Sequence, residues 1–271
     1  MPDAVKLSSP ATGEFWEIPV LFEDADMLVL NKPAGLLVSP DRSDAKRPNL
    51  MQLLHGEIER GAAWTKPRRL EYLMNAHRLD GGASGVMVLA KNKPALVALV
   101  AQFSAEPPCR IYAALVRGAS TEDTFSTDVK LAPHPLQMGI VRVDAKEGKR
   151  SRTEFAVRER FDGWVLLECR PVPDRSHQIR VHLKHLRLPL AGDEIYGGRL
   201  LFLSTLKPNY RLKPGHEERP LISRPALHCE QVSIKHPVTA EKLTLAAPSP
   251  KDLTVSIKYL RRYKAGAQTS S

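Results

Sequence analysis

The chain has 271 residues, enough to bury a full hydrophobic core in one large domain or two closely associated ones. Its 40 lysines and arginines outnumber its 30 acidic residues, and the net charge of +10 favours a polyanionic partner such as nucleic acid over a merely solvated basic surface. Cys109, Cys169 and Cys229 lack the close spacing of a structural zinc site, so we expect reduced thiols and a cytoplasmic protein. No signal-peptide pattern or apolar run of membrane-spanning length is present, so no membrane partner is expected.

The first part of the chain predicts a short arm followed by strands and a helix. Residues 1–17 are polar and interrupted by proline and glycine, and we expect them to form a loose arm before a folded domain at 18–260. Apolar runs predict strands at 18–22 and 27–31. Asn49 is expected to cap a helix, because an apolar pattern with the 3.6-residue period starts directly after it.

The stretch from His77 to Asn92 reads HRLDGGASGVMVLAKN, and the rest of the argument depends on it. Its apolar run at 86–90 predicts a buried strand, so Asp80 lies where the chain changes direction at the edge of a rigid sheet. Catalytic groups often occupy such positions. The alternative is an ordinary Asp-Gly turn in which the Asp80 side chain bonds only its own backbone.

The second part of the chain predicts more strands than helices. A helix is expected after Asn92, another after Ser176 as its N-cap, and a last one at 251–263. Residues 199–224 are basic and irregular, and 261–271 are expected to form a disordered basic tail. Predicted strands lie at 110–117, 125–131, 139–143, 153–157, 164–169, 226–234 and 242–246. Most connections are too short for parallel crossovers, so the expected fold class is α+β, with a largely antiparallel mixed sheet and flanking helices.

Two pairings of chemically active residues are conceivable from the sequence. Asp80 would suit nucleophilic catalysis if Arg180 lay beside it, since a nearby arginine keeps a carboxylate ionised and fixes its direction. Arg180 is otherwise one of several solvated helix cations. His182 and His185 have the spacing to share a metal, but His177 falls elsewhere on the helix and no carboxylate is suitably spaced, so no metal is expected.

Basic stretches interleaved with Trp64 and Tyr112 suggest a third possibility. Nucleic-acid enzymes stack an extruded base on an aromatic ring and hold phosphates with lysine and arginine. A tyrosine within a strand is more often a core residue, because aromatic side chains pack well on sheets. The pattern alone therefore leaves both interpretations of Tyr112 open.

Taken together, the motifs HRLDGGASGVMVLAKN, RIYAALV and RSHQIRVHL, in this order, resemble the signature of the RluA-type family of RNA pseudouridine synthases. NKPAGLLVSP, GKRSRTEF and LHCEQVSIKHPVT resemble further segments of that family, so the similarity spans roughly residues 18–255. The combination of HRLD with HQIRVH is rarely found outside the family. The resemblance is therefore specific.

The resemblance implies a site and a fold. Asp80 would be the catalytic aspartate, Tyr112 would stack on the target base and take part in proton transfer, and Arg180 would pair with the aspartate. Arg78 would contact the RNA backbone or fill the gap left by the flipped base. The family fold is a mixed sheet of two halves with the active site in a cleft between them. Further residues expected to bind RNA are Lys149, Arg150, Arg152, Arg175 and Lys184.

The chain departs from the family pattern at two places. Ala83 stands where the family usually has threonine, which removes one hydroxyl near Asp80. Asp174 stands where the family usually has glycine, and Ser176 replaces a threonine. Neither departure falls on one of the three carried-over catalytic residues.

The resulting hypothesis is an RNA pseudouridine synthase that modifies rRNA or tRNA in the cytoplasm. Residues 18–260 would form its catalytic domain, and no appended RNA-binding module is expected at the N-terminus. We expect a monomer that needs neither a metal nor an organic cofactor. A non-catalytic RNA-binding protein on the same scaffold is the main alternative, and a metal-dependent nuclease using the histidine group is a third.

Overall fold

The structure is a computed structural model that describes residues 4–40, 44, 46–104 and 110–265. Most of its strands form one eleven-stranded sheet, in the order β1-β2-β3-β5-β12-β6-β11-β10-β7, with β4 beside β5 and β13 beside β12. These strands are β1 (Ala4–Ser9), β2 (Glu14–Glu23), β3 (Met27–Lys32), β4 (Met74–Asn75), β5 (Ser84–Ala90), β6 (Arg110–Arg117), β7 (Thr124–Thr127), β10 (Arg152–Phe161), β11 (Trp164–Val172), β12 (Leu227–Lys235) and β13 (Lys242–Ala246). A separate hairpin consists of β8 (Leu131–Pro133) and β9 (Val141–Val143).

The sheet consists of two halves that meet where β5 lies beside β12. All other neighbouring strands pair antiparallel, whereas β5 and β12 pair parallel, through His228 with Ser84 and Cys229 with Gly85. Gly85 has φ +118° and lies so close to Cys229 that a Cβ atom would come within 2.1 Å of its carbonyl oxygen. Glycine is therefore required at this contact. The predicted α+β class with a largely antiparallel mixed sheet is confirmed.

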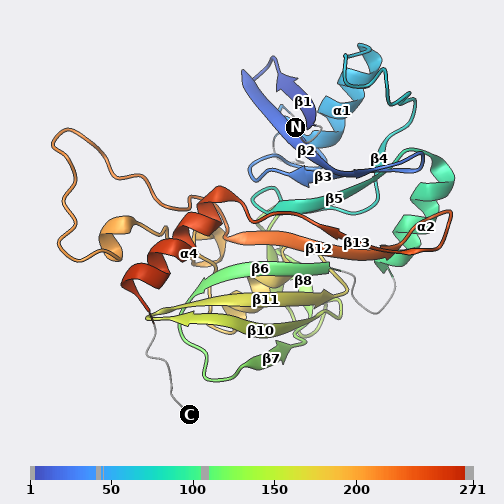
Figure 1. The fold of residues 1–271 in the computed structure, drawn as a ribbon. Helices are drawn as coiled ribbons and strands as arrows, with labels where there is room; N and C mark the ends of the chain where they lie inside the picture. The colour runs from blue at the N-terminus through green and yellow to red at the C-terminus, as the bar shows by residue number, and fades with distance from the viewer. Residues whose placement is uncertain (1–3, 41–43, 45, 105–109, 266–271) are drawn as a thin grey trace.

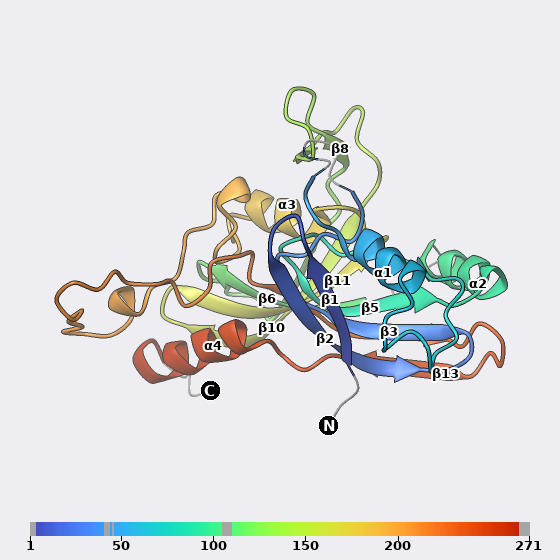
Figure 2. The same ribbon diagram turned by 90° about the horizontal axis from the view of Figure 1, so that it is seen from above.

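Helices cover both faces of this sheet (Figures 1 and 2). The helices are α1 (Leu50–Glu59), α2 (Lys93–Ser104), α3 (Gln178–His185) and α4 (Lys251–Tyr263), with short 3₁₀ turns η1 (Glu194–Tyr196) and η2 (Leu203–Thr205). Leu183 of α3 packs in the cluster that contains Ala114, whereas Leu253 of α4 packs with Ala113 and Leu115. Because alternate residues of β6 point to opposite faces, α3 and α4 lie on opposite sides of the second half.

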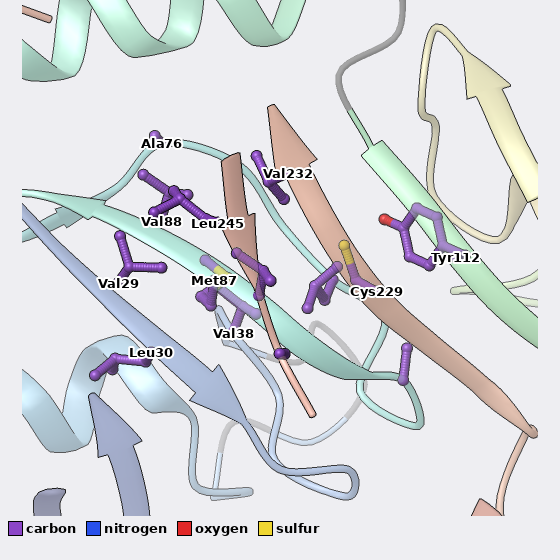
Figure 3. Close-up of a cluster of buried hydrophobic side chains, with 14 of the residues drawn as sticks. Val29, Leu30, Val38, Ala76, Met87, Val88, Tyr112, Cys229, Val232 and Leu245 are labelled. Carbon is purple, nitrogen blue, oxygen red and sulfur yellow. The ribbon is translucent and has the colours of Figure 1, made fainter. Parts of the chain in front are cut away.

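The main core lies against β5, as the sequence predicts for this strand. All seven residues of β5 are buried, and they pack with β3 and β12 in one cluster that also contains Tyr112 (Figure 3). Asn49 and Asn92 accept the backbone N–H bonds expected of N-caps, at 3.0 Å from Gln52 and 2.8 Å from Ala95. On α2, Leu99 is buried whereas the neighbouring Val100 is 42 % exposed.

The N-terminal arm predicted for residues 1–17 is wrong for the described part. Residues 4–9 and 14–23 form the antiparallel pair β1–β2, in which Val5 and Leu7 are fully buried. The turn between them uses Gly13 at φ +68°, whose N–H donates to Ser9 at 2.8 Å. Two apolar side chains in a six-residue strand are too weak a pattern to detect, yet they close one edge of the core.

The C-terminal tail also begins later than predicted. Helix α4 has the predicted bounds, 251–263, so residues 261–263 are helical and not part of a disordered tail. The remainder of the predicted tail, 266–271, lies outside the described residues. No helix in the described ranges is long and apolar enough to cross a membrane.

Candidate active site

Asp80 lies on a tight turn just before β5, at the junction of the two halves. The turn is closed by the Ala83 N–H, which donates to the Asp80 carbonyl at 3.0 Å. A neighbouring loop braces it, because the Gly35 N–H donates to the Gly81 carbonyl at 2.8 Å. A Cβ atom on Gly81 would lie 2.7 Å from the Leu37 side chain, so the loop and the turn are in close contact. The carboxylate of Asp80 is thus presented by a rigid support.

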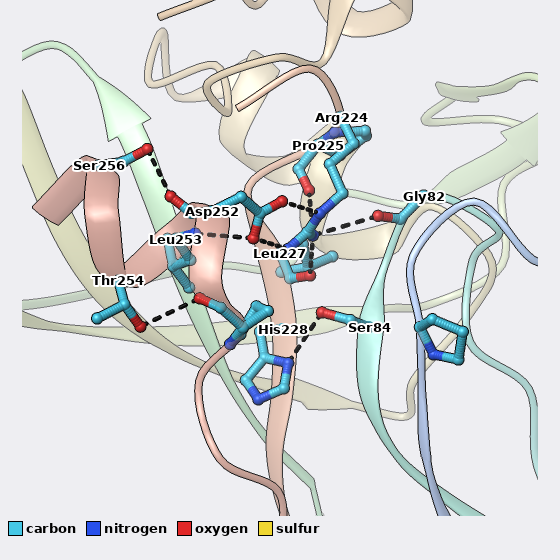
Figure 4. Close-up of polar contacts among 12 residues, drawn as sticks. Gly82, Ser84, Arg224, Pro225, Leu227, His228, Asp252, Leu253, Thr254 and Ser256 are labelled. Carbon is cyan, nitrogen blue, oxygen red and sulfur yellow. Dashed lines mark hydrogen bonds and ion pairs between the residues drawn. The ribbon is translucent and has the colours of Figure 1, made fainter. Parts of the chain in front are cut away.

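Arg224 contacts the Asp80 turn through a hydrogen bond to Gly82 (Figure 4). Its Nη1 donates to the carbonyls of Gly82 at 3.4 Å and Pro225 at 3.0 Å. Its Nε and Nη2 donate to the Asp252 carboxylate of α4 at 2.7 and 2.9 Å. One side chain therefore connects the Asp80 turn, the start of β12 and the last helix. Arg224 comes from the segment 199–224, which the sequence could not place.

The Asp80 carboxylate faces the start of α3. Its Oδ1 accepts a hydrogen bond from the His177 backbone N–H at 3.3 Å, and its Oδ2 lies 3.7 Å from Nη1 of Arg180. The expected pairing of Asp80 with Arg180 is therefore present as a loose ion pair. The positive end of the helix dipole adds to this attraction. The carboxylate does not bond its own turn, as the alternative interpretation required.

The beginning of α3 explains why the predicted cap at Ser176 is wrong. His177 occupies the N-cap position in a left-handed conformation with φ 57°, and no side chain caps the helix. The backbone N–H of His177 is instead directed at Asp80. Helix α3 therefore has no side-chain cap, and the backbone N–H at its start donates to Asp80, which is distant in the sequence.

Arg180 has a stronger partner than Asp80. Its Nε and Nη2 donate to the two carboxylate oxygens of Asp193, each at 2.7 Å. The Arg180 side chain is 5 % exposed and that of Asp193 is 1 % exposed, so Arg180 is not a solvated helix cation. Burial alone would lower the pKa of Arg180, but the hydrogen bonds to Asp193 outweigh it and the pKa is raised. A bidentate pair of this kind fixes the guanidinium plane.

His177 and Tyr196 complete the surroundings of the carboxylate. The Tyr196 hydroxyl accepts a hydrogen bond from the Val141 N–H at 2.9 Å and lies 2.7 Å from Nδ1 of His177. Donation of the phenol proton to Nδ1 leaves the imidazole proton on Nε2, which lies 4.0 Å from Oδ1 of Asp80. Burial lowers the pKa of His177, so the ring is neutral at pH 7. The guanidinium of Arg180 lies over the Tyr196 ring at 4.8 Å.

Tyr112 projects from β6 beside Cys229 of β12 (Figure 3). The residue is 3 % exposed, and its hydroxyl donates to Oδ2 of Asp174 at 2.6 Å. Nε of Arg110 lies 3.1 Å from the same oxygen. Burial and the charge of Asp174 raise the pKa of Tyr112 well above its usual value, so the phenol is protonated. Tyr112 is therefore a core residue with one polar atom held at a fixed place.

Lys32 is a buried charge close to this site. It is 0 % exposed, and its Nζ donates to the carbonyls of Pro33 at 2.8 Å and Leu36 at 2.7 Å. Burial lowers its pKa to about 7, although the negative charge of Asp80 opposes that shift. These bonds shape the loop that supports the Asp80 turn. The sequence around Lys32, Lys-Pro-Ala-Gly, is typical of a turn and does not indicate a buried lysine.

Four of the six predicted RNA-binding residues are exposed and lie near Asp80, namely Arg78, Lys149, Arg150 and Lys184. Arg78 is two residues before Asp80, and Lys184 is exposed with its Nζ 5.8 Å from the Tyr196 ring. Arg175 donates from Nε to the Arg150 carbonyl at 2.9 Å, which brings the loop of exposed Lys149 and Arg150 beside the segment that leads into α3.

The structure does not bring Arg152 to this group. On β10 the neighbouring Thr153 faces α3, where its hydroxyl bonds His182 at 2.8 Å. Arg152 therefore points to the other face of the sheet. There it pairs with Glu154 at 3.1 Å and lines a cavity of about 470 Å³ with Glu168 and Arg170. This cavity is separate from the Asp80 site.

The profile of the RNA pseudouridylate synthase family matches residues 26–185, which include Asp80, Tyr112 and Arg180. The chain belongs to this family. A protein of Xanthomonas campestris named ribosomal large subunit pseudouridine synthase D is 37 % identical over 251 residues, covering 92 % of this chain and 71 % of that protein. Ribosomal large subunit pseudouridine synthase C of Escherichia coli is 35 % identical over 244 residues, covering 89 % of this chain and 70 % of that protein.

Solved structures share the fold. The human RNA pseudouridylate synthase domain containing 4 superposes with a TM-score of 0.65 over 89 % of this chain and 92 % of that chain, at 21 % identity. The predicted membership in the RluA-type family of RNA pseudouridine synthases is confirmed by the relatives. The chain is accordingly an isomerase that converts uridine to pseudouridine in RNA.

The histidines of this pseudouridine synthase do not form a metal site in the described ranges. His182 is buried, with Nδ1 at 2.8 Å from the Thr153 hydroxyl and Nε2 at 3.2 Å from the Val129 carbonyl. The one group there with metal-binding spacing is Asp24, Asp26 and His236. His236 accepts the Thr239 N–H on Nδ1, so its Nε2 carries the proton that it donates to Asp24 at 2.8 Å. That nitrogen has no lone pair for a metal.

Sequence reasoning missed several residues of the pseudouridine synthase site. Asp193 and Tyr196 lie in a loop rich in glycine, where a Cβ on Gly198 would come within 1.9 Å of the Leu190 carbonyl. The signal available was the pattern Gly-Asp-x-x-Tyr-Gly, two polar residues held between glycines after a helix. Arg224 carries no such signal, since its partners lie far away in sequence.

Proposed function

We propose that this pseudouridine synthase isomerises one defined uridine in RNA by extracting the target base from its stack and bringing the nucleotide to Asp80. The observation that carries the proposal is the setting of Asp80. Its carboxylate, 17 % exposed, is supported by a braced turn and faces the His177 N–H at 3.3 Å and Arg180 at 3.7 Å. A carboxylate that faces a fixed arginine and is reachable from solvent is what this chemistry requires.

The reaction cleaves the N1–C1′ glycosidic bond and joins the same base to C1′ through C5. The C5 proton leaves and N1 gains a proton, so the RNA keeps its composition. Asp80 would add to the sugar or the base, or remove a sugar proton, and each route requires an ionised carboxylate. Arg180 would orient that carboxylate, because Asp193 fixes the position of the guanidinium. Tyr112 would contact the detached base while the base turns.

The phosphates of the RNA would be bound by the exposed cations around the site. The exposed ones are Arg78, Lys149, Arg150 and Lys184, and the half-buried Arg175 lies beside the Lys149–Arg150 loop. Neutralising phosphates releases counterions, and this gain offsets the few kcal/mol, about 2–4, that unstacking a base costs. Arg152 is not included, because it lies on the opposite face of the sheet.

The substrate that the relatives favour is ribosomal RNA, with transfer RNA as the second candidate. The similar proteins from Xanthomonas and Escherichia coli are named as ribosomal large subunit pseudouridine synthases. Segment 199–224 would contribute to the choice of substrate, since it is largely exposed and carries Arg199, Lys207, Arg211, Lys213 and Arg219. We place the enzyme in the cytoplasm, where the buried thiols of Cys169 and Cys229 would stay reduced. A monomer that works without a metal or organic cofactor stays a prediction.

Purified protein and unmodified transcripts test this proposal. Transcripts of large-subunit ribosomal RNA and of transfer RNAs are incubated with wild type or Asp80→Asn, and pseudouridine is mapped by carbodiimide modification and primer extension. The proposal expects one modified position with wild type and none with the variant. RNA binding without modification by wild type would favour the alternative, a non-catalytic RNA-binding protein.

A further inference from the structure

Asp174 connects two side chains of β6 at the edge of the active site. It accepts the Tyr112 hydroxyl at 2.6 Å and lies 3.1 Å from Nε of Arg110, and both contacts are made by its Oδ2. The Asp174 side chain is 12 % exposed and that of Arg110 is 7 % exposed. At this position the family resemblance leads us to expect glycine, which has no side chain to bond a tyrosine. The Tyr112–Asp174 contact thus depends on a side chain that the family pattern lacks at this position.

The backbone that carries Asp174 also contacts Asp80. Residues 173–177 join the end of β11 to the start of α3. Asp174 bonds Tyr112 at one end of this segment, and the His177 N–H bonds Asp80 at the other. Asp80 also lies near enough for its negative charge to act on the Asp174 carboxyl. The segment therefore holds Tyr112 and Asp80 in one arrangement.

We propose that Asp174 is a positioning residue that accepts the phenol proton of Tyr112 when Tyr112 takes the C5 proton from the target base. The proposal rests on the proposed function, in which Tyr112 contacts the detached base. A phenol that has to remove a proton is a weak base, and it becomes effective when its own proton can pass to a carboxylate at hydrogen-bond distance. The 2.6 Å contact meets that requirement.

The step balances without any further reagent. After the base has joined C1′ through C5, the C5–H bond breaks, its electron pair forms the C5=C6 double bond, and N1 takes up a proton from water. The C5 proton goes to the Tyr112 oxygen as the original phenol proton moves to Oδ2 of Asp174. The protonated carboxyl of Asp174 then returns its proton to water at its exposed edge. The enzyme is regenerated with Tyr112 as phenol and Asp174 as carboxylate.

The groups around Asp174 suit a carboxylate that accepts a proton, with Arg110 at 3.1 Å as its positive partner. Burial is the largest effect, and together with the charge of Asp80 it raises the pKa of Asp174, although Arg110 and the Tyr112 hydroxyl oppose that shift. The thiols of Cys229 on β12 and Cys169 on β11 are the register partners of Tyr112 on its two sides. Arg110 thus keeps Asp174 ready as an acceptor, and burial makes proton uptake easier than it would be in water.

The test uses substrate RNA deuterated at C5 of the target uridine, with release of deuterium read by mass spectrometry. Asp174→Asn keeps the shape of the side chain but cannot take a proton. We expect it to slow single-turnover conversion by about 100-fold. RNA affinity should stay within a few-fold of wild type, and the C5 isotope effect should rise above the wild-type value. Asp123→Asn, which alters an exposed carboxylate paired with Arg160, is the matched control.

A double-mutant cycle with Tyr112→Phe separates proton transfer from structural support. If the proton passes through the pair, the effects of the two substitutions on the rate are not additive. Asp174→Glu, which restores a carboxylate, should recover part of the rate. An Asp174→Asn enzyme with the wild-type rate and isotope effect would overturn the proposal. So would a slow enzyme with an unchanged isotope effect and additive substitutions.

Two further outcomes keep the result interpretable. If Asp174→Asn lowers the unfolding temperature so far that it cannot be assayed, Tyr112→Phe is used alone, since it leaves the Arg110–Asp174 pair in place. That variant must then show the raised isotope effect, and an unchanged one overturns the proposal. A wild-type enzyme that releases no deuterium from any RNA would overturn the proposed function and this inference with it. Activity lost in Asp80→Asn but unchanged in Asp174→Asn would overturn this inference alone.

Discussion

Asp193 accepts two 2.7 Å hydrogen bonds from Arg180 and thereby fixes the guanidinium that faces Asp80. Arg180 lies 3.7 Å from Asp80, too far for a hydrogen bond. The arginine is therefore anchored by one carboxylate and directed at another. Asp193 compensates the buried charge of Arg180, and Nη1 of Arg180 faces Asp80 and orients its carboxylate.

Replacing Arg180 should affect both folding and turnover. Arg180→Ala leaves Asp193 buried without its partner, so we expect a loss of about 3–5 kcal/mol in the free energy of unfolding. Arg180→Lys keeps the charge but loses the fork-shaped pair, and turnover should fall at least about ten-fold, or roughly 1.4 kcal/mol in barrier height. Urea unfolding and single-turnover kinetics measure the two effects. A lysine enzyme of wild-type speed would remove Arg180 from the mechanism.

The loop carrying Lys149 and Arg150 should supply part of the salt dependence of RNA binding. Replacing both with alanine is expected to weaken binding and to reduce the slope of log affinity against log salt by about 1.4–1.8. Arg152→Ala is the matched control, since Arg152 lies nearby in sequence but on the opposite face of the sheet. Titrations at several salt concentrations give the slopes. Equal slopes for the double variant and wild type would mean that Lys149 and Arg150 are solvated and do not contact phosphates.

Lys32 should make stability depend on pH. Its folded pKa is about 7, below the usual 10.5, so between these values the unfolded chain holds a proton that the folded chain lacks. Stability should therefore rise with pH in this window, by at most about 1.4 kcal/mol per pH unit, and be lost as pH falls towards 7. Lys32→Met should abolish this slope. Urea unfolding between pH 7.5 and 9 tests it, and parallel slopes for both proteins would contradict a buried lysine of low pKa.

Gly85 should be essential for joining the two halves of the sheet. Gly85→Ala places a Cβ within 2.1 Å of the Cys229 carbonyl oxygen at φ +118°. We expect a loss of about 3 kcal/mol or more, or failure to fold. Gly56→Ala is the control, because Gly56 lies within α1 with open space around it and alanine should stabilise the helix by up to about 1 kcal/mol. Thermal unfolding of both variants compares them, and a stable Gly85→Ala protein would contradict the close approach.

Much of the fold is predictable because it is encoded locally. Helix α4 and strand β6 have the predicted bounds, since each has a clear apolar period and definite ends. The pair β1–β2 is not predictable, because Val5 and Leu7 give too short a pattern. Helix α3 is placed correctly but starts one residue later than a cap at Ser176 would allow, since Asp80 uses the His177 N–H.

The site is predictable only in part, for a similar reason. Asp80, Tyr112 and Arg180 stand in recognisable motifs, and the structure brings Asp80 and Arg180 together. The residues that support them act across the fold: Arg224 bonds Gly82, which is 142 positions away. Asp174 stands out in the sequence only as a departure from a motif, and its bond to Tyr112 spans 62 positions. Linear spacing carries no information on such contacts.

Pseudouridine mapping of total RNA from cells with and without the gene tests the central claim most directly. We expect one uridine to lose its modification when the gene is deleted. The signal should return with the wild-type gene, and not with Asp80→Asn expressed at the same level. Restoration by Asp80→Asn would contradict the assignment of Asp80. An unchanged map, together with no activity of the purified protein on unmodified transcripts, would contradict the proposed function.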